Sequence, residues 1–92
     1  MSYCRATIKC YGLVQGVGYR YYCNRSALAI GLTGWVKNCS DSTVELVVEG
    51  KKNNIEIILE ELKIGPSSAN VTKIDIKWGE YKNEFNGFEV RF

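Results

Sequence analysis

The hydrophobic and polar positions of this 92-residue chain first alternate and then change to a helical period. Between residues 4 and 10, Cys4, Ala6, Ile8 and Cys10 alternate with polar residues, which predicts a half-buried strand. Between residues 19 and 30, apolar and small residues recur at offsets of three and four. This spacing predicts one buried face of a helix that ends before Gly31.

The rest of the chain predicts three more strands, a second helix and a short final strand. Residues 32–38 and 43–50 have strand patterns, with a turn between them. A second helix is predicted with Asn53 as its N-cap and an end at Gly65-Pro66; Ile55, Ile58, Leu59 and Leu62 form its apolar face. Alternation returns at residues 74–78 and 88–92. Val71 is out of phase with the first of these, which predicts a bulge before Ile74.

This order of elements predicts an α+β fold of the ferredoxin-like βαββαβ type. We expect an antiparallel sheet with both helices on one face and a short additional C-terminal strand. With 46% hydrophobic residues and no repeat or linker, residues 1–92 are expected to form a single domain. The sequence has no run of about 20 apolar residues and no signal-peptide pattern, so we expect a cytoplasmic protein without a membrane segment.

Charge and cysteine content narrow the classes of ligand. The net charge of +2 and the pI near 8.4 fall short of a module devoted to nucleic acid and favour a small anionic ligand. The four cysteines include no Cys-x-x-Cys pair, and the chain has no histidine, so neither a metal site nor a cofactor is expected. Cys4 and Cys10 are too far apart on one strand to form a disulfide, and buried thiols are the simplest interpretation of the cysteines.

A glycine-rich loop lies between the first predicted strand and the first predicted helix. Gly12, Gly16 and Gly18 allow consecutive backbone N–H groups to turn toward one point. No Ser, Thr, Asp or Asn lies between Gly12 and Tyr22 to cap the helix, so an anion could serve as its cap. The guanidinium of Arg20 is suited to two phosphate oxygens at once.

We call residues 15–20 the phosphate cradle. Its predicted ligand groups are mainly the backbone N–H groups of Gln15, Gly16, Val17, Gly18, Tyr19 and Arg20. Glycine content alone leaves a second interpretation open, in which the loop is a tight connection and Arg20 a solvated side chain. Nucleotide binding is disfavoured, because the loop lacks the Gly-Lys-Ser/Thr ending of a P-loop and Tyr21 replaces the last glycine of a dinucleotide motif.

Two ordered motifs resemble the signatures of the acylphosphatase family: residues 12–20 (GLVQGVGYR) and residues 31–38 (GLTGWVKN). The similarity extends to the Gly65-Pro66 break and to residues 88–91. It implies that Arg20 binds the phosphate, that Asn38 orients the attacking water, and that the substrate is a small-molecule acyl phosphate. The family usually has a glycine where this chain has Ser42, in the turn that follows Asn38.

The chemistry of an acyl phosphate suits these residues. Its leaving group is a carboxylate that is stable without protonation, so a chain without histidine can hydrolyse it by stabilising charge and placing water. Asn38 cannot act as a base, but its amide can hold a water molecule in line with phosphorus. We therefore expect a monomeric, metal-independent hydrolase that uses direct water attack, without a covalent intermediate. Nothing in the sequence indicates a pocket for the acyl group.

Two alternatives remain at this stage. The same fold could be a non-catalytic phosphate-binding or anion-binding module, with Ser42 marking a relaxed site. It could also bind RNA through Tyr19, Tyr21 and Tyr22, although stacking aromatics in ferredoxin-like RNA modules project from central strands and not from a helix.

Overall fold

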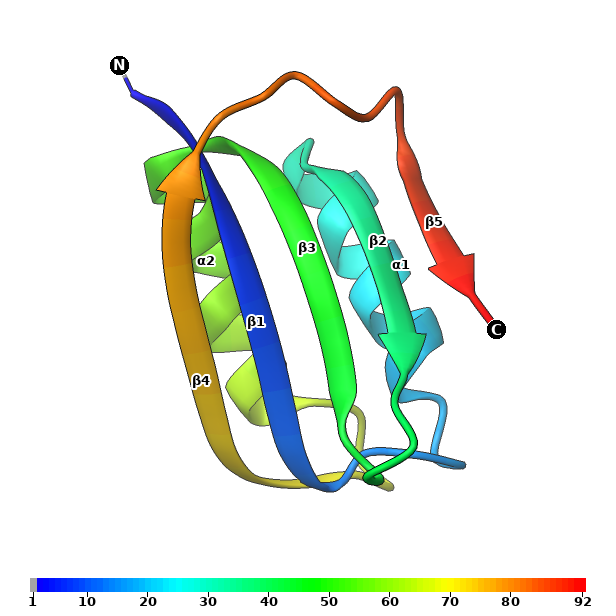
Figure 1. The fold of residues 1–92 in the computed structure, drawn as a ribbon. Coiled ribbons are helices and arrows are strands. Elements are labelled where there is room, and N and C mark those ends of the chain that lie inside the picture. The colour runs from blue at the N-terminus through cyan, green and yellow to red at the C-terminus, as the bar shows by residue number, and fades with distance from the viewer. Residues whose placement is uncertain (1) are drawn as a thin grey trace.

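The structure, a computed structural model, describes residues 2–92 and contains five strands and two helices in one layered arrangement (Figure 1). Both helices cover the same face of the sheet, as the sequence predicts. Neither described helix is long and apolar enough to cross a membrane. In chain order the elements are β1 (Tyr3–Leu13), α1 (Tyr19–Ile30), β2 (Thr33–Asn38), β3 (Val44–Lys51), α2 (Lys52–Ile64), β4 (Asn70–Glu80) and β5 (Phe88–Arg91).

The sheet has the strand order β4-β1-β3-β2-β5. The first four of these strands pair antiparallel, as expected for the ferredoxin-like fold, but β5 pairs parallel to β2. The four strands of the predicted antiparallel sheet are confirmed, and the short additional C-terminal strand joins them in parallel, so the whole sheet is mixed. Because β2 and β5 run in the same direction, Asn38 and Arg91 come from strand ends on the same side of the molecule (Figure 1).

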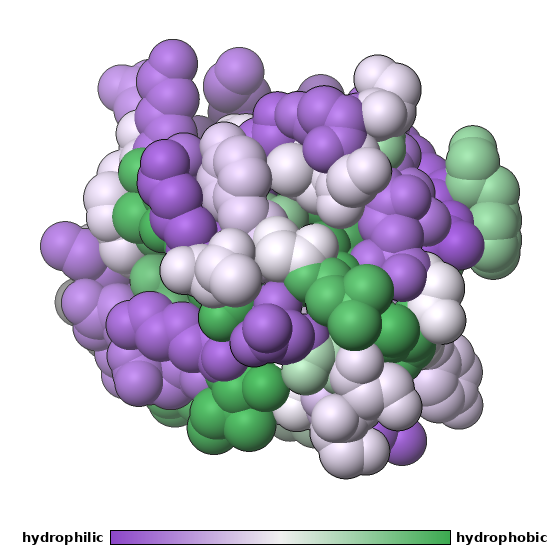
Figure 2. Space-filling model, turned by 90° about the horizontal axis from the view of Figure 1, so that it is seen from below, coloured by the Kyte–Doolittle hydropathy of each residue, from purple (hydrophilic) through white to green (hydrophobic). Residues whose placement is uncertain are grey.

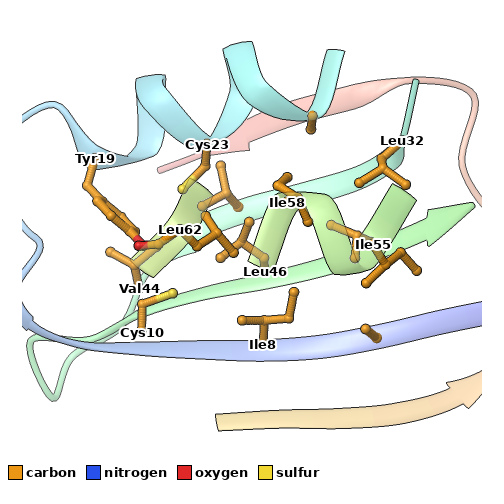
Figure 3. Packing of buried hydrophobic residues seen from close by; sticks show 14 of the residues in the cluster. Ile8, Cys10, Tyr19, Cys23, Leu32, Val44, Leu46, Ile55, Ile58 and Leu62 are labelled. Carbon is orange, nitrogen blue, oxygen red and sulfur yellow. The ribbon is translucent and has the colours of Figure 1, made fainter. Parts of the chain in front are cut away.

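The core lies between the two helices and the helix-facing side of the sheet (Figure 3). Ile8 and Leu46 reach it from adjacent strands, and Cys23 and Ile58 reach it from the two helices; all four are fully buried. The predicted periodicities are confirmed in β1, α1 and α2, whose buried positions are those that the sequence places on the apolar face. In β3, Val47 and Glu49 on the opposite face are buried as well. Burial of the core side chains supplies the main driving force for holding both helices on the sheet.

The start of α2 differs from the prediction. The helix begins at Lys52, directly after β3, and the residue at its N-cap position is Lys51 rather than Asn53. The amide of Lys52 donates to the carbonyl oxygen of Ser2 at 3.0 Å. A backbone oxygen next to β1 therefore satisfies one of the opening amides that a side-chain cap would otherwise serve. The predicted end is correct, because Gly65 caps the helix and its amide donates to Glu61.

The predicted bulge in β4 is confirmed. Tyr11 pairs with Lys73 and Gly12 pairs with Val71, so Thr72 is the extra residue on β4. Val71 and Ile74, on either side of it, both pack against the core, which explains why their spacing breaks strict alternation.

The turn between β2 and β3 holds Ser42 in a left-handed conformation, with φ of 71°. The backbone amide of Cys39 donates to the carbonyl oxygen of Thr43 (2.9 Å), and the backbone amide of Ser42 donates to the carbonyl oxygen of Cys39 (3.2 Å). This is the pattern of a three-residue hairpin loop whose last residue favours glycine. Ser42 therefore adopts the conformation that a glycine would take there, and the turn keeps its form.

Glu49 fixes the connection that leads from β4 to β5. Its buried carboxylate accepts hydrogen bonds from the amides of Lys82 (2.7 Å) and Glu84 (3.0 Å) and pairs with Arg5 (3.2 Å). Burial alone would raise the pKa of Glu49, but the two amides and Arg5 together hold that pKa below its usual value. The carboxylate therefore stays charged, and it anchors the segment that brings β5 to the sheet edge.

Candidate active site

A cavity of about 450 Å³ opens at the end of the molecule where α1 begins and where β2 and β5 end. Figure 2 looks onto this lower end of the molecule and shows hydrophobic side chains exposed among hydrophilic ones. The volume is within the usual range for small-molecule sites. The lining comes from the glycine-rich loop and α1, from the end of β2 and from the end of β5: Val14, Gly16, Gly18, Tyr19, Arg20, Tyr21, Asn24, Asn38, Val90 and Phe92.

The glycine-rich loop leads directly into α1 and leaves the first amides of the helix unpaired within it. Gly16 and Gly18 have φ angles of 72° and 78°, which side chains rarely adopt. The first helical hydrogen bond runs from the amide of Tyr22 to Gly18, and among the described residues no side chain caps the helix. The N–H groups before Tyr22 and the positive end of the helix dipole thus favour an anion at this point.

The guanidinium of Arg20 is held at the cavity by the end of β5. Its Nη1 donates to the carbonyl oxygen of Arg91 at 2.9 Å, and its central carbon lies 4.5 Å from the centre of the Phe92 ring. A guanidinium has five N–H donors, so this hydrogen bond leaves most of them for a ligand. The contacts limit the positions that the long side chain can occupy, which lowers the entropy cost of binding a phosphate group.

Asn38 is the last residue of β2 and lines the same cavity as Arg20. Its Oδ1 is buried and accepts no hydrogen bond from any residue that the structure describes. A buried amide oxygen without a donor costs about 1–3 kcal/mol, so a hydrogen-bond donor is expected beside it. A water molecule bound at this oxygen is positioned by the side chain without losing a proton to it.

The structure brings only part of the predicted phosphate cradle to the cavity. Gly16, Gly18, Tyr19 and Arg20 line it, whereas Gln15 and Val17 are not among its lining residues. The side chain of Val17 packs against the core. That of Gln15 instead donates from Nε2 to the carbonyl oxygens of Cys39 (2.8 Å) and Thr43 (2.9 Å) and joins the loop to the turn after Asn38.

Tyr19 can contribute to the cradle through its backbone but not through its ring. The ring is buried in the core, and its hydroxyl donates to the carbonyl oxygen of Leu62 at 2.7 Å (Figure 3). Burial raises the pKa of Tyr19 far above its usual value, so the phenol remains a neutral donor. Tyr22 is likewise bound to Glu61 of α2, and Tyr21 alone of the three is exposed. The idea of a three-tyrosine surface for RNA loses its basis.

Several lining residues were missed by the sequence reasoning. Asn24 lies four residues after Arg20, so helical spacing already placed both on one face of α1. Val90 and Phe92 could not be found in this way. Their place in the cavity depends on the parallel pairing of β5 with β2, which local sequence patterns do not reveal.

Comparison with known proteins gives one consistent family. The acylphosphatase family model matches residues 6–90. The acylphosphatase of Pelotomaculum thermopropionicum is 40% identical over 100% of both chains, and that of Thermococcus kodakarensis is 41% identical over 98% of both. The crystal structure of acylphosphatase from Bacillus subtilis superposes with a TM-score of 0.93 at 32% identity, covering 97% of this chain and 99% of the other.

These matches cover the whole fold and include the loop, the turn and the strand ends that form the cavity. They also agree with the family that residues 12–20 and 31–38 resemble. The chain therefore belongs to the acylphosphatase family, and it is an enzyme that hydrolyses acyl phosphates.

Proposed function

We propose that this acylphosphatase works by direct attack of water on phosphorus, with Arg20 and the phosphate cradle binding the phosphoryl group and Asn38 orienting the water. The observation that carries the proposal is the meeting of Arg20 and the buried, unpaired Oδ1 of Asn38 in one cavity. A cation and a water acceptor are the two groups that the reaction needs.

The steps balance without a protein acid or base. The water oxygen forms a bond to phosphorus while the bond between phosphorus and the acyl oxygen breaks, and the carboxylate leaves with the bonding electron pair. One proton of the water passes to the phosphate product or to solvent. Because the carboxylate needs no proton, catalysis rests on positioning and on charge stabilisation by Arg20 and the opening amides of α1.

We propose that the reaction needs neither a metal ion nor a covalent intermediate. The positive charge that a metal would give to the phosphoryl oxygens comes from Arg20 and from the start of α1. The described lining residues include no Ser, Thr, Cys, Lys, His, Asp or Glu, so the cavity offers no aliphatic hydroxyl, thiol, amine, imidazole or carboxylate nucleophile. Its two hydroxyl groups are the phenols of Tyr21 and of Tyr19, and that of Tyr19 is buried and bound to Leu62.

Turnover of an acyl phosphate in the presence of a chelator tests this mechanism. Loss of water placement in Asn38→Ala should lower kcat by about 10²-fold or more. Arg20→Ala should lower kcat/KM by about 10³-fold, because it weakens both binding and transition-state stabilisation. Lys63→Ala and Asn53→Ala, both on α2 and outside the cavity, are control variants that should keep wild-type rates.

The alternative of a phosphate-binding module makes a different prediction. Inorganic phosphate would then raise the melting temperature, while no acyl phosphate would be hydrolysed. Full activity in both Arg20→Ala and Asn38→Ala would likewise refute the assignment of these residues.

We further propose that the enzyme acts as a monomer in the cytoplasm. Arg20, Asn38 and the residues around them come from one chain, so no second subunit is needed to complete the described site. The four cysteines are free thiols, which agrees with a reducing compartment. A sedimentation measurement of the active species tests the oligomeric state.

A further inference from the structure

The cavity extends beyond Arg20 and Asn38 into an apolar wall. This wall consists of Val14 from the glycine-rich loop, Tyr21 from α1, and Val90 and Phe92 from the end of the chain. It is contiguous with the phosphate cradle, because Arg20 and Phe92 are in direct contact. A molecule bound at Arg20 through its phosphate would therefore have its other half beside these four side chains.

The charges of the cavity restrict what that other half can be. Among the described lining residues, Arg20 is the one charged side chain, and Asn24 and Asn38 are the only residues with a side-chain amide. In the proposed function Arg20 is occupied by the phosphate. An acyl group with its own carboxylate would find no second cation among these lining residues, because Arg25 packs over the ring of Tyr21 (5.6 Å) from outside the lining. Such a carboxylate would lose part of its hydration against the apolar wall.

The exposure of the wall indicates that it has apolar area left to bury. Phe92 is fully exposed and Tyr21 is 67% exposed, which makes them the two most exposed aromatic side chains in the described chain. Figure 2 shows hydrophobic surface at this end of the molecule. Covering such surface with an apolar group is favourable in proportion to the area removed from water.

The bonding of the substrate fixes the distance between its two halves. The acyl carbon is only two bonds from phosphorus, so a phosphate at Arg20 carries the acyl group along wherever it binds. The ring of Phe92 lies 4.5 Å from the guanidinium carbon of Arg20, within reach of a substituent on that acyl carbon. The two halves of the site are thus spaced for a single small molecule.

We propose that Val14, Tyr21, Val90 and Phe92 form an acyl subsite that selects acyl phosphates with an apolar acyl group, aromatic or aliphatic, over small or anionic ones. This inference rests on the proposed function. It assigns the non-phosphate half of the substrate to named side chains and gives the substrate class that they accept.

The test compares kcat/KM for three probes: benzoyl, acetyl and succinyl phosphate. The variants are Tyr21→Ala and Phe92→Ala, and the control is Leu28→Ala, a 57% exposed residue of α1 outside the cavity. For each variant, kcat/KM with benzoyl phosphate is divided by kcat/KM with acetyl phosphate. The readout is the quotient of this ratio and the same ratio for the wild type. Differences in intrinsic reactivity cancel in this quotient, and so does any disturbance of Arg20 that affects both substrates equally.

The subsite predicts that the quotient falls about threefold in Tyr21→Ala and about fivefold in Phe92→Ala, and stays at one in Leu28→Ala. It also predicts that wild type uses succinyl phosphate less well than benzoyl phosphate. Turnover with a quotient of one in both variants would overturn the subsite and leave the proposed function standing. No turnover of any probe by the wild type would overturn both.

Discussion

Ser42 has a backbone conformation that side chains seldom adopt. Its φ of 71° places it in the left-handed region, where an L side chain costs about 1–2 kcal/mol. The turn tolerates this cost because its two hydrogen bonds define the loop geometry independently of the side chain. Ser42 is thus a source of local strain next to the site and no sign of a relaxed active site.

Ser42→Gly should stabilise the protein by about 0.5–1 kcal/mol, since relief of the strain outweighs the extra freedom of glycine in the unfolded chain. Chemical denaturation measures this change. Ser40→Gly is the matched control: its φ is not positive, so the same change should destabilise by about 0.5 kcal/mol. Equal effects of the two substitutions would show that the conformation of Ser42 stores no strain.

At the scale of elements, the glycine-rich loop and the β2–β3 turn are joined by one side chain. Gln15 makes two hydrogen bonds to the carbonyl oxygens of Cys39 and Thr43, on either side of the turn. Cys39 directly follows Asn38, so Gln15 connects the proposed phosphate cradle to the residue that we propose orients the water. We predict that Gln15 is a positioning residue, because its two hydrogen bonds hold the turn that begins directly after Asn38.

Gln15→Met keeps the length of the side chain but removes both hydrogen bonds. We expect kcat to fall on the order of tenfold with a smaller change in KM, because Asn38 loses part of its fixed position while Arg20 is unaffected. Lys9→Met is the control, since it removes the Lys9–Asp41 ion pair (2.8 Å), an exposed tie that links the same turn to β1. A wild-type kcat in Gln15→Met would reduce Gln15 to a structural role.

Sequence patterns predicted most elements of this fold because each has one buried face. The helical spacing of Tyr19, Cys23 and Ala27 and the alternation of β1 both come from packing against a common core. The start of α2 was missed because a backbone oxygen from Ser2, distant in sequence, serves where a side-chain cap was expected. For the same reason the role of the Gln15 side chain was not predicted, since its hydrogen-bond partners lie 24 and 28 residues away.

At the scale of the whole molecule, a buried carboxylate links the pH to stability. The amides of Glu84 and Lys82 and the guanidinium of Arg5 hold the pKa of Glu49 below its usual 4.5 against the effect of burial. The unfolded chain therefore binds more protons than the folded chain at acid pH. The stabilisation by Glu49 is complete above about pH 4.5 and is lost as the pH falls through the lowered pKa.

Glu49→Gln should destabilise the protein by about 2–3 kcal/mol at pH 7. Gln cannot form an ion pair with Arg5, and it has one acceptor oxygen where the carboxylate uses two for the amides of Lys82 and Glu84. The difference from wild type should shrink as the pH is lowered toward 3. Urea denaturation at a series of pH values measures both effects. A difference that is constant with pH would mean that the charge of Glu49 does not contribute.

The part of the site that sequence could not predict is the part that depends on this connection. The motifs around Arg20 and Asn38 indicate phosphate chemistry locally, and both residues do meet in one cavity. The apolar wall does not appear in any local pattern, because Phe92 reaches it only after the connection anchored by Glu49 has returned the chain to the edge of the sheet.

The hydrogen bond from the Arg20 guanidinium to the carbonyl oxygen of Arg91 joins residues 71 positions apart. Contacts of such sequence separation are costly to close, and they form late when a chain folds. In refolding, the helices and the three central strands can therefore give most of the circular dichroism signal before the two edge strands dock. These are β5, which pairs with β2, and β4, whose pairing with β1 joins residues as distant as Cys4 and Glu80. Catalytic activity would return after that signal. The rate at which turnover recovers therefore reports the last step of assembly and not the collapse of the core.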